Sequence, residues 1–255
     1  MLKETVRKVL KRFNIGILPY HYYQAFRALE EDVEDLLAMP TEKLEQLVPL
    51  LPKSKAQLRQ DLYVLLQLDF KREGYFVEFG ATNGQVLSNT HLLEKEFGWT
   101  GILAEPARSW HGELRENRNC HIETDCVWRE TGASLEFMES KDKEFSTISD
   151  FQGTGEHKRA RQDSVTYEVK TISLNDLLDK YYAPATMDYL SIDTEGSEYE
   201  ILAHLDHDRY RFRVITCEHA FTDTREKIYD LLTSKGYKRQ HLGFSKWDDW
   251  FVLEG

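Results

Sequence analysis

Residues 74–105 constrain the fold of this chain more than any other stretch. In order, they read as a buried strand (75–79), a glycine turn (80–84), an amphipathic helix and a second strand (102–104), with the apolar helix residues Val86, Leu87, Leu92, Leu93 and Phe97. A crossover of this length joins two parallel strands in a right-handed βαβ unit. The chain is therefore expected to build an α/β domain around a mostly parallel sheet.

The turn after the first strand has the features of a nucleotide site. Its backbone N–H groups can face a ligand, and Glu105, at the tip of the second strand, can accept both hydroxyls of a ribose. A dinucleotide site usually carries G-x-G-x-x-G, whereas this loop has only Gly80 and Gly84. With Glu78 inside the strand, the loop suits a ligand that has a ribose and no pyrophosphate, such as S-adenosylmethionine. A plain turn and an ordinary strand-end acid are the alternatives.

Composition limits the class of protein. The chain has 255 residues, a net charge of -11 and 30% charged residues, which suits a globular α/β domain with an appended segment and argues against broad nucleic-acid binding. Cys120, Cys126 and Cys217 form no C-x-x-C pair, so we expect reduced thiols in a cytoplasmic protein. No apolar run approaches the ~18 residues that a transmembrane helix needs.

The first 73 residues read as an N-terminal helical segment, and residues 74–255 as the ligand-binding domain. In residues 2–13 the apolar side chains fall on one helix face and the basic side chains on the other. Such a helix could pack on the main domain or on a second copy of the chain in a homodimer. It could also make a peripheral contact with a membrane.

A third strand is predicted for residues 120–124. The residues that follow it, Asp125 and Cys126, are expected beside the base of a bound nucleotide. Asp125 is a candidate acceptor for an adenine amino group, although it could also be a turn acid.

Two further strands, at 134–138 and 165–171, flank a polar loop at 141–163. A loop of this length inside a compact domain is usually a functional lid or disordered. We expect a lid near the active site, with basic residues for an anionic group of the substrate: Lys158, Arg159 and Arg161.

Acidic residues gather after the strand predicted for 187–192. Glu198 opens the next helix, where an acid favours the helix dipole, but Asp193 and Glu195 have no such structural explanation. They follow the carboxyl end of a strand, where open α/β sheets bind ligands. The sequence therefore places Asp193 and Glu195 at a functional edge.

The neighbouring strand, 214–217, ends in Glu218 and His219. Asp193, Glu195 and Glu218 could together hold Mg²⁺ or Mn²⁺, because hard divalent ions prefer oxygen ligands. Alternatively, Asp193 or His219 could act as a general base. His219 could equally be a structural residue.

A helix over residues 225–235 ends at Gly236, and a terminal antiparallel hairpin follows at 237–242 and 249–253. These elements complete a seven-stranded Rossmann-like sheet, with helices on both faces, in which only the last strand is reversed.

Several segments resemble the FkbM family of S-adenosylmethionine-dependent methyltransferases: YFVEFGATNG, GILAEP, SIDTEGSEYEIL and DDWFVL. The resemblance covers about residues 54–255. It implies the class I methyltransferase fold and methylation of hydroxyl groups on sugars, polysaccharides or natural products. Thr82 and Asn83 depart from the family pattern, in which an acid is frequent in this loop.

The resemblance also implies roles for particular residues. The glycine loop, with Ala81 and Asn83 in it, would hold the methionine end of the cofactor, and Glu105 its ribose. The remaining implied positions are Glu78, Gly80 and Gly84 at the methionine end, and Asp193, Glu195 and Glu198 at the border of the transfer site. We therefore expect O-methylation of a saccharide or other small-molecule acceptor. The alternatives are N-methylation and a non-catalytic sugar- or nucleotide-binding module.

Overall fold

The computed structural model of the chain describes residues 39–140, 147–148, 164–219, 223–240 and 245–254. Residues 42–255 form one compact unit. The basic helix predicted at the N-terminus and most of the predicted lid, including its basic residues, lie outside the described residues.

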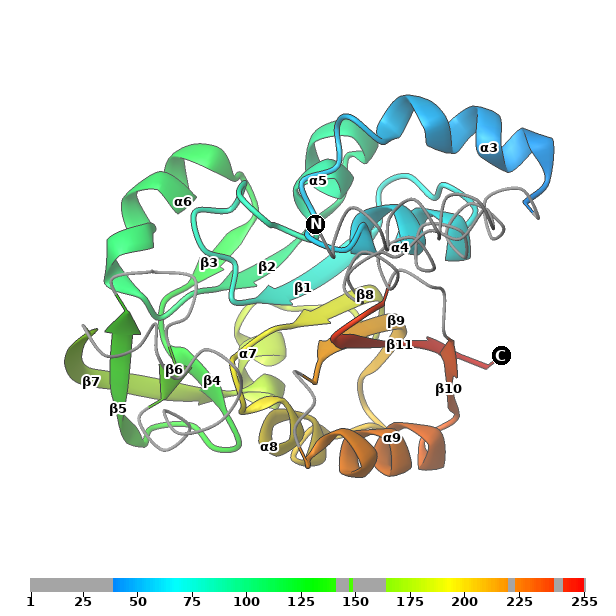
Figure 1. Cartoon of the computed structure of the whole chain (residues 1–255). Helices are drawn as coiled ribbons and strands as arrows, with labels where there is room; N and C mark the ends of the chain where they lie inside the picture. The colour runs from blue at the N-terminus through cyan, green and yellow to red at the C-terminus, as the bar shows by residue number, and fades with distance from the viewer. Residues whose placement is uncertain (1–38, 141–146, 149–163, 220–222, 241–244, 255) are drawn as a thin grey trace, which may run out of the picture. The chain divides into compact units, whose positions relative to one another are not determined.

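A seven-stranded sheet forms the centre of the unit that begins at Glu42 (Figure 1). Its strands, in order across the sheet, are β10 (Tyr237–Gln240), β11 (Asp248–Leu253), β9 (Arg211–Glu218), β8 (Thr186–Ile192), β1 (Tyr75–Phe79), β2 (Thr100–Ala104) and β3 (His121–Glu123). Neighbours from β9 to β3 pair in parallel, whereas β11 pairs antiparallel with both β9 and β10. The predicted sheet with one reversed strand is confirmed.

Helices cover both faces of this sheet. In Figure 1, α4 and α5 lie on one side and α7, α8 and α9 on the other. The helices and 3-10 turns are α3 (Thr41–Leu47), η1 (Val48–Leu50), α4 (Gln60–Gln67), α5 (His91–Phe97), η2 (Arg108–Trp110), α6 (His111–Asn117), α7 (Leu174–Lys180), α8 (Glu198–Ala203) and α9 (Arg225–Ser234). Apolar residues of α7, α8 and α9 share one buried core with the inward face of β1, β8 and β9. Burial of this core is the main source of stability for the sheet.

A second sheet of four strands, in the order β4-β7-β5-β6, lies between β3 and α7 in the chain. Its strands are β4 (Cys126–Trp128), β5 (Ser134–Ser140), β6 (Thr147–Ile148) and β7 (Ser164–Ser173). β5 and β7 pair antiparallel from Ser134–Lys170 to Ser140–Ser164, which confirms the two strands predicted on either side of the polar loop.

The helix after the glycine turn begins later than the hydrophobic pattern predicts. Asn83 Oδ1 accepts hydrogen bonds from the backbone N–H groups of Gln85 (3.0 Å) and Val86 (2.8 Å), which holds this stretch in a turn. Side chains of this kind compete with helical hydrogen bonding. Val86 and Leu87 are consequently 46% and 37% exposed, and α5 begins only at His91.

Within the described part of the chain, no helix has the length and apolar character to cross a membrane.

Candidate functional site

Gly80 and Gly84 are both required by close contacts within the protein. Both have positive φ angles, 72° and 75°. A Cβ on Gly80 would lie 2.1 Å from the Asp193 carbonyl oxygen, and a Cβ on Gly84 would lie 2.6 Å from Cγ of Arg118. Gly80 therefore lets the end of β1 approach the end of β8, and Gly84 makes room for a buried arginine.

Glu78 anchors the segment that follows the glycine turn. Its buried carboxylate accepts hydrogen bonds from Ser88 Oγ (3.1 Å), the Asn89 N–H (2.7 Å) and Thr90 Oγ1, and it lies 3.8 Å from the Arg118 guanidinium. Burial raises the pKa of Glu78, and the charge of Arg118 opposes that rise. Glu78 thus acts on any ligand mainly through the loop that it holds in place.

The other side chains of the glycine turn are also committed to the protein. Ala81 is buried, and the Asn83 amide donates to Glu113 Oε2 at 3.1 Å while its oxygen holds the turn. We therefore expect a ligand to meet Ala81 and Asn83 through their backbone.

Glu105 lies where the sequence places it, at the end of β2 beside the glycine turn. Its Oε2 accepts from the Thr82 N–H and its Oε1 from the Ala107 N–H, both at 2.8 Å. Each oxygen keeps a second lone pair, so it can also accept a hydroxyl group. Burial raises the pKa of Glu105 to about 7.

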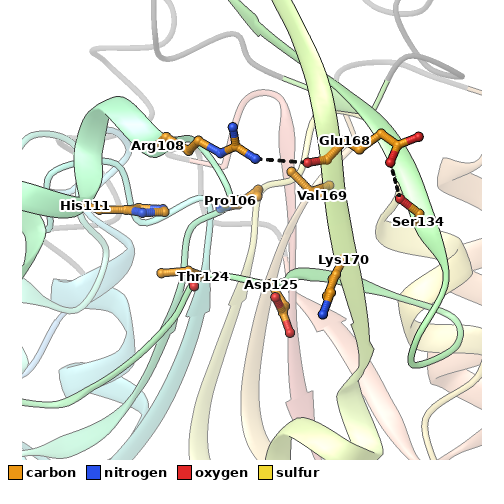
Figure 2. Close-up of a pocket in the computed structure, with 9 residues that line it drawn as sticks. All are labelled: Pro106, Arg108, His111, Thr124, Asp125, Ser134, Glu168, Val169 and Lys170. Atoms are coloured by element: carbon orange, nitrogen blue, oxygen red, sulfur yellow. Dashed lines mark hydrogen bonds between the residues drawn. The ribbon is translucent and has the colours of Figure 1, made fainter.

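A pocket of about 370 Å³ adjoins this acid (Figure 2). Its lining residues are Pro106, Arg108, His111, Thr124, Asp125, Ser134, Glu168, Val169 and Lys170. His111 Nε2 donates to the Glu105 carbonyl oxygen at 2.8 Å, which ties the pocket to the end of β2. Asp125 therefore lines the same pocket as Pro106 and Arg108, which follow Glu105 in the chain.

Cys126 does not line this pocket. It begins β4 and is buried in a small apolar cluster with Trp128 and Phe137. Burial raises the pKa of its thiol to about 12. This placement does not bring Cys126 to the pocket, and its predicted contact with the cofactor stays a prediction.

One wall of the pocket comes from the antiparallel β5–β7 pair, a contribution that the local sequence pattern does not indicate. The Arg108 guanidinium donates to the Glu168 carbonyl oxygen (3.1 Å), and Ser134 Oγ donates to Glu168 Oε2 (3.3 Å) (Figure 2). The polar alternation in residues 164–171 indicates an exposed strand face, but only the pairing of distant segments shows what that face lines.

Three predicted acids converge at the ends of β8 and β9. Asp193, Glu195 and Glu218 each place one carboxylate oxygen within 4.8 Å of the others, and all three are partly exposed. Burial, together with the charges of Asp193 and Glu195, raises the pKa of Glu218 well above its usual value. This cluster has the oxygen ligands that a hard divalent cation prefers.

Glu198 gives the acidic loop its shape. Its Oε1 accepts from the N–H groups of Thr194 (2.9 Å) and Gly196 (3.0 Å). Glu195 takes a left-handed backbone, with φ 59°, inside this braced turn. Glu198 therefore positions Asp193 and Glu195, and its own carboxylate is committed to the backbone.

His219 is surrounded by other charged groups than those of the acidic cluster. Its side chain is buried, and the charges that act on it most strongly belong to Asp249, Arg225 and Arg239. Asp249 accepts two hydrogen bonds from Arg225, at 2.8 and 2.7 Å. Burial lowers the pKa of His219 to about 4, so the imidazole is neutral at physiological pH. Its predicted catalytic role stays a prediction.

Residues 78–239 match a family model described as the methyltransferase FkbM domain. None of the curated proteins matches the chain. Similar solved structures include an O-methyltransferase from Bacillus cereus in complex with SAH, which is 16% identical with a TM-score of 0.40 and aligns over 89% of this chain and 97% of that one. Another is a precorrin-6y C5,15-methyltransferase from Geobacter metallireducens, 13% identical with a TM-score of 0.40, aligned over 75% of this chain and 85% of that one.

Proposed function

Because the chain belongs to the FkbM methyltransferase family and is an S-adenosylmethionine-dependent methyltransferase, we propose that its acceptor is a sugar hydroxyl in a saccharide or natural product. The observation that carries this proposal is the convergence of Asp193, Glu195 and Glu218 beside the glycine turn. Carboxylates accept hydrogen bonds from the several hydroxyls of a sugar. A sugar hydroxyl is also a weak nucleophile at neutral pH, which such a group of acids can activate.

The cofactor is proposed to lie across the carboxyl ends of β1 and β2. The Glu105 carboxylate would accept the ribose hydroxyls, and the adenine would enter the neighbouring pocket, with its amino group near Asp125. The methionine part would lie over the turn between Gly80 and Gly84. This placement directs the sulfonium methyl group toward the ends of β8 and β9.

Asp193, Glu195 and Glu218 would hold a Mg²⁺ or Mn²⁺ ion. Such an ion, when bound, would lower the pKa of a coordinated hydroxyl. With or without the ion, Asp193 would accept the proton of the acceptor hydroxyl. The methyl group would pass from the sulfonium sulfur to the hydroxyl oxygen, which leaves S-adenosylhomocysteine as the second product. Alignment of oxygen, methyl and sulfur by the protein would supply much of the rate increase.

Assembly and location are further parts of the proposal. The acidic overall charge supports an acceptor other than nucleic acid, and the unpaired Cys120, Cys126 and Cys217 support a cytoplasmic location. The basic amphipathic helix predicted for residues 2–13 would serve a homodimer or a peripheral membrane contact.

Calorimetric titration with S-adenosylhomocysteine tests the cofactor site. We expect binding by the wild type, and Glu105→Ala should weaken it by about 2 kcal/mol, the scale of a lost charge-assisted hydrogen bond. Added Mg²⁺ should release or absorb further heat in the wild type and not in Asp193→Ala. Equal binding by the wild type and Glu105→Ala would contradict the ribose assignment.

Transfer of a labelled methyl group to a panel of saccharides tests the acceptor. Asp193→Ala should abolish transfer while S-adenosylhomocysteine still binds, and chelation of divalent ions should lower the wild-type rate. The position of the label in the product distinguishes O-methylation from N-methylation. Full activity of Asp193→Ala would remove this residue from the mechanism.

A further inference from the structure

Asn89 is buried, and only the nitrogen of its side-chain amide makes a hydrogen bond within the described part of the chain. It is 8% exposed. Its Nδ2 donates to Ser191 Oγ at 2.9 Å, and its backbone N–H donates to Glu78 Oε1 at 2.7 Å. No hydrogen-bond donor among the residues that the structure describes reaches Asn89 Oδ1. A buried amide oxygen without a partner costs free energy, so a bound group that donates to it is expected.

The two anchors place Asn89 beneath the site. Glu78 on β1 and Ser191 on β8 are register partners, and each lies two residues before a residue of the site edge, Gly80 and Asp193 respectively. The strand order reverses here, because β2 lies on one side of β1 and β8 on the other. Ligands of open α/β sheets bind at this switch point.

Hydrogen bonds hold the two neighbours of Asn89 in place. Ser88 Oγ and Thr90 Oγ1, on either side of it, both donate to the Glu78 carboxylate, and Arg118 donates to both hydroxyl groups. The amide is thus oriented before a ligand arrives, so little entropy is lost when a donor binds to its free oxygen.

We propose that Asn89 Oδ1 accepts a hydrogen bond from the ammonium group of the cofactor's methionine part. This ammonium is the strong N–H donor at the end of the cofactor that would lie over the glycine turn. A charged donor makes a stronger hydrogen bond to an amide oxygen than a neutral donor does, which favours the ammonium at this position. The inference rests on the cofactor placement proposed above.

Two ligands that differ in the amino-acid part test the proposal. S-adenosylhomocysteine carries the ammonium, whereas 5′-methylthioadenosine lacks the whole amino-acid part. Asn89→Ala should weaken the binding of S-adenosylhomocysteine about tenfold or more, the loss expected for a hydrogen bond to a charged group, and leave that of 5′-methylthioadenosine unchanged. Asn89→Asp keeps an acceptor oxygen and should bind S-adenosylhomocysteine within a fewfold of the wild type.

Asn175→Ala is the matched control, because the Asn175 amide donates to the His204 carbonyl oxygen, away from the ends of β1 and β8. It should bind both ligands like the wild type. Thermal unfolding of each variant confirms that it is folded, and Asn89→Ser replaces Asn89→Ala if the alanine variant does not fold.

Three results would overturn the role of Asn89: unchanged binding of S-adenosylhomocysteine by Asn89→Ala, equal weakening of both ligands, or Asn89→Asp as weak as Asn89→Ala. The second result would assign Asn89 to the loop structure alone. A wild type that binds neither ligand would remove the cofactor placement itself, and with it this inference. Failure of the Asn89 assignment and failure of the cofactor placement therefore give different results.

Discussion

Gly80 joins the two central strands of the site at one backbone position. Its φ of 72° is left-handed, and the Asp193 carbonyl oxygen occupies the space that a Cβ would need. Gly98, at the end of α5, has nearly the same φ, 70°, but nothing lies within 4 Å of its Cβ position. A comparison of Gly80 with Gly98 therefore separates two reasons for a glycine: the left-handed backbone, which both need, and the lack of space for a Cβ atom, which applies only to Gly80.

Gly80→Ala should therefore destabilise the protein more than Gly98→Ala. The left-handed conformation alone costs about 1 kcal/mol for alanine, which is the loss expected at Gly98. Displacement of the Asp193 carbonyl adds an overpacking cost, for a total of about 3 kcal/mol at Gly80. Denaturant unfolding of both variants measures the difference, and equal losses would show that the ends of β1 and β8 can separate freely.

At the scale of elements, Arg118 holds together α6, α5 and the loop that leads from β1 to α5. It follows the last residue of α6, and its side chain is fully buried. Its guanidinium donates to Glu94 Oε2 on α5 (2.7 Å), to the Gly84 carbonyl (3.1 Å) and to Thr90 Oγ1 (2.9 Å). The segment from Gly84 to Thr90 has little regular structure, so this arginine substitutes for backbone pairing.

Arg118→Met should destabilise the protein by about 3–5 kcal/mol, because it leaves the buried Glu78 carboxylate without its opposite charge. Arg115→Met is the control on the same helix. Arg115 is exposed, and within the described part of the chain its one hydrogen bond goes to the His111 carbonyl oxygen. Its loss should change stability by no more than about 0.5 kcal/mol. Similar unfolding midpoints for the two variants would contradict the role assigned to Arg118.

At the scale of the whole molecule, Asp248 connects the last strand of the sheet to α4, 188 residues earlier in the chain. This buried residue of β11 accepts hydrogen bonds from Gln60 Nε2 of α4 (2.9 Å) and from Trp250 Nε1 (3.3 Å). Burial raises the pKa of Asp248 from 3.8 to about 7. The folded protein therefore binds a proton here that the unfolded chain releases at lower pH.

The sign of the pH effect follows from that shift. The stability contributed by protonated Asp248 is present below pH 3.8 and is lost as the pH rises toward 7. Asp248→Asn keeps the acceptor oxygen and has no proton to lose. Its stability relative to the wild type should therefore rise by about 3 kcal/mol between pH 4 and pH 7 and then level off.

The comparison with wild type is needed because burial lowers the pKa values of the half-buried His91 and the buried His219 to about 4. These two histidines therefore make the wild type more stable as the pH rises over part of the same range. Asp230→Asn, at an exposed position on α9, is the matched control for the loss of a carboxyl group. Denaturant unfolding across this pH range provides the measurement. A constant difference for Asp248→Asn would show that folding does not raise the pKa of this carboxyl group.

The sequence by itself determined the seven-stranded sheet, its reversed strand and the acids at the strand ends. These features depend on local hydrophobic period and on topology, since parallel strands bring residues such as Glu105, Asp193 and Glu218 to one edge.

Only the tertiary structure decided which groups each side chain contacts. Glu78 was predicted to face a ligand, but it meets Arg118, 40 residues further along the chain, and His219 meets the Asp249–Arg225 pair while its neighbour Glu218 meets the acids. The antiparallel β5–β7 pair likewise became a pocket wall only when the chain closed on itself. The physical reason is that burial, hydrogen bonding and charge act through space between residues far apart in sequence, which no local pattern records.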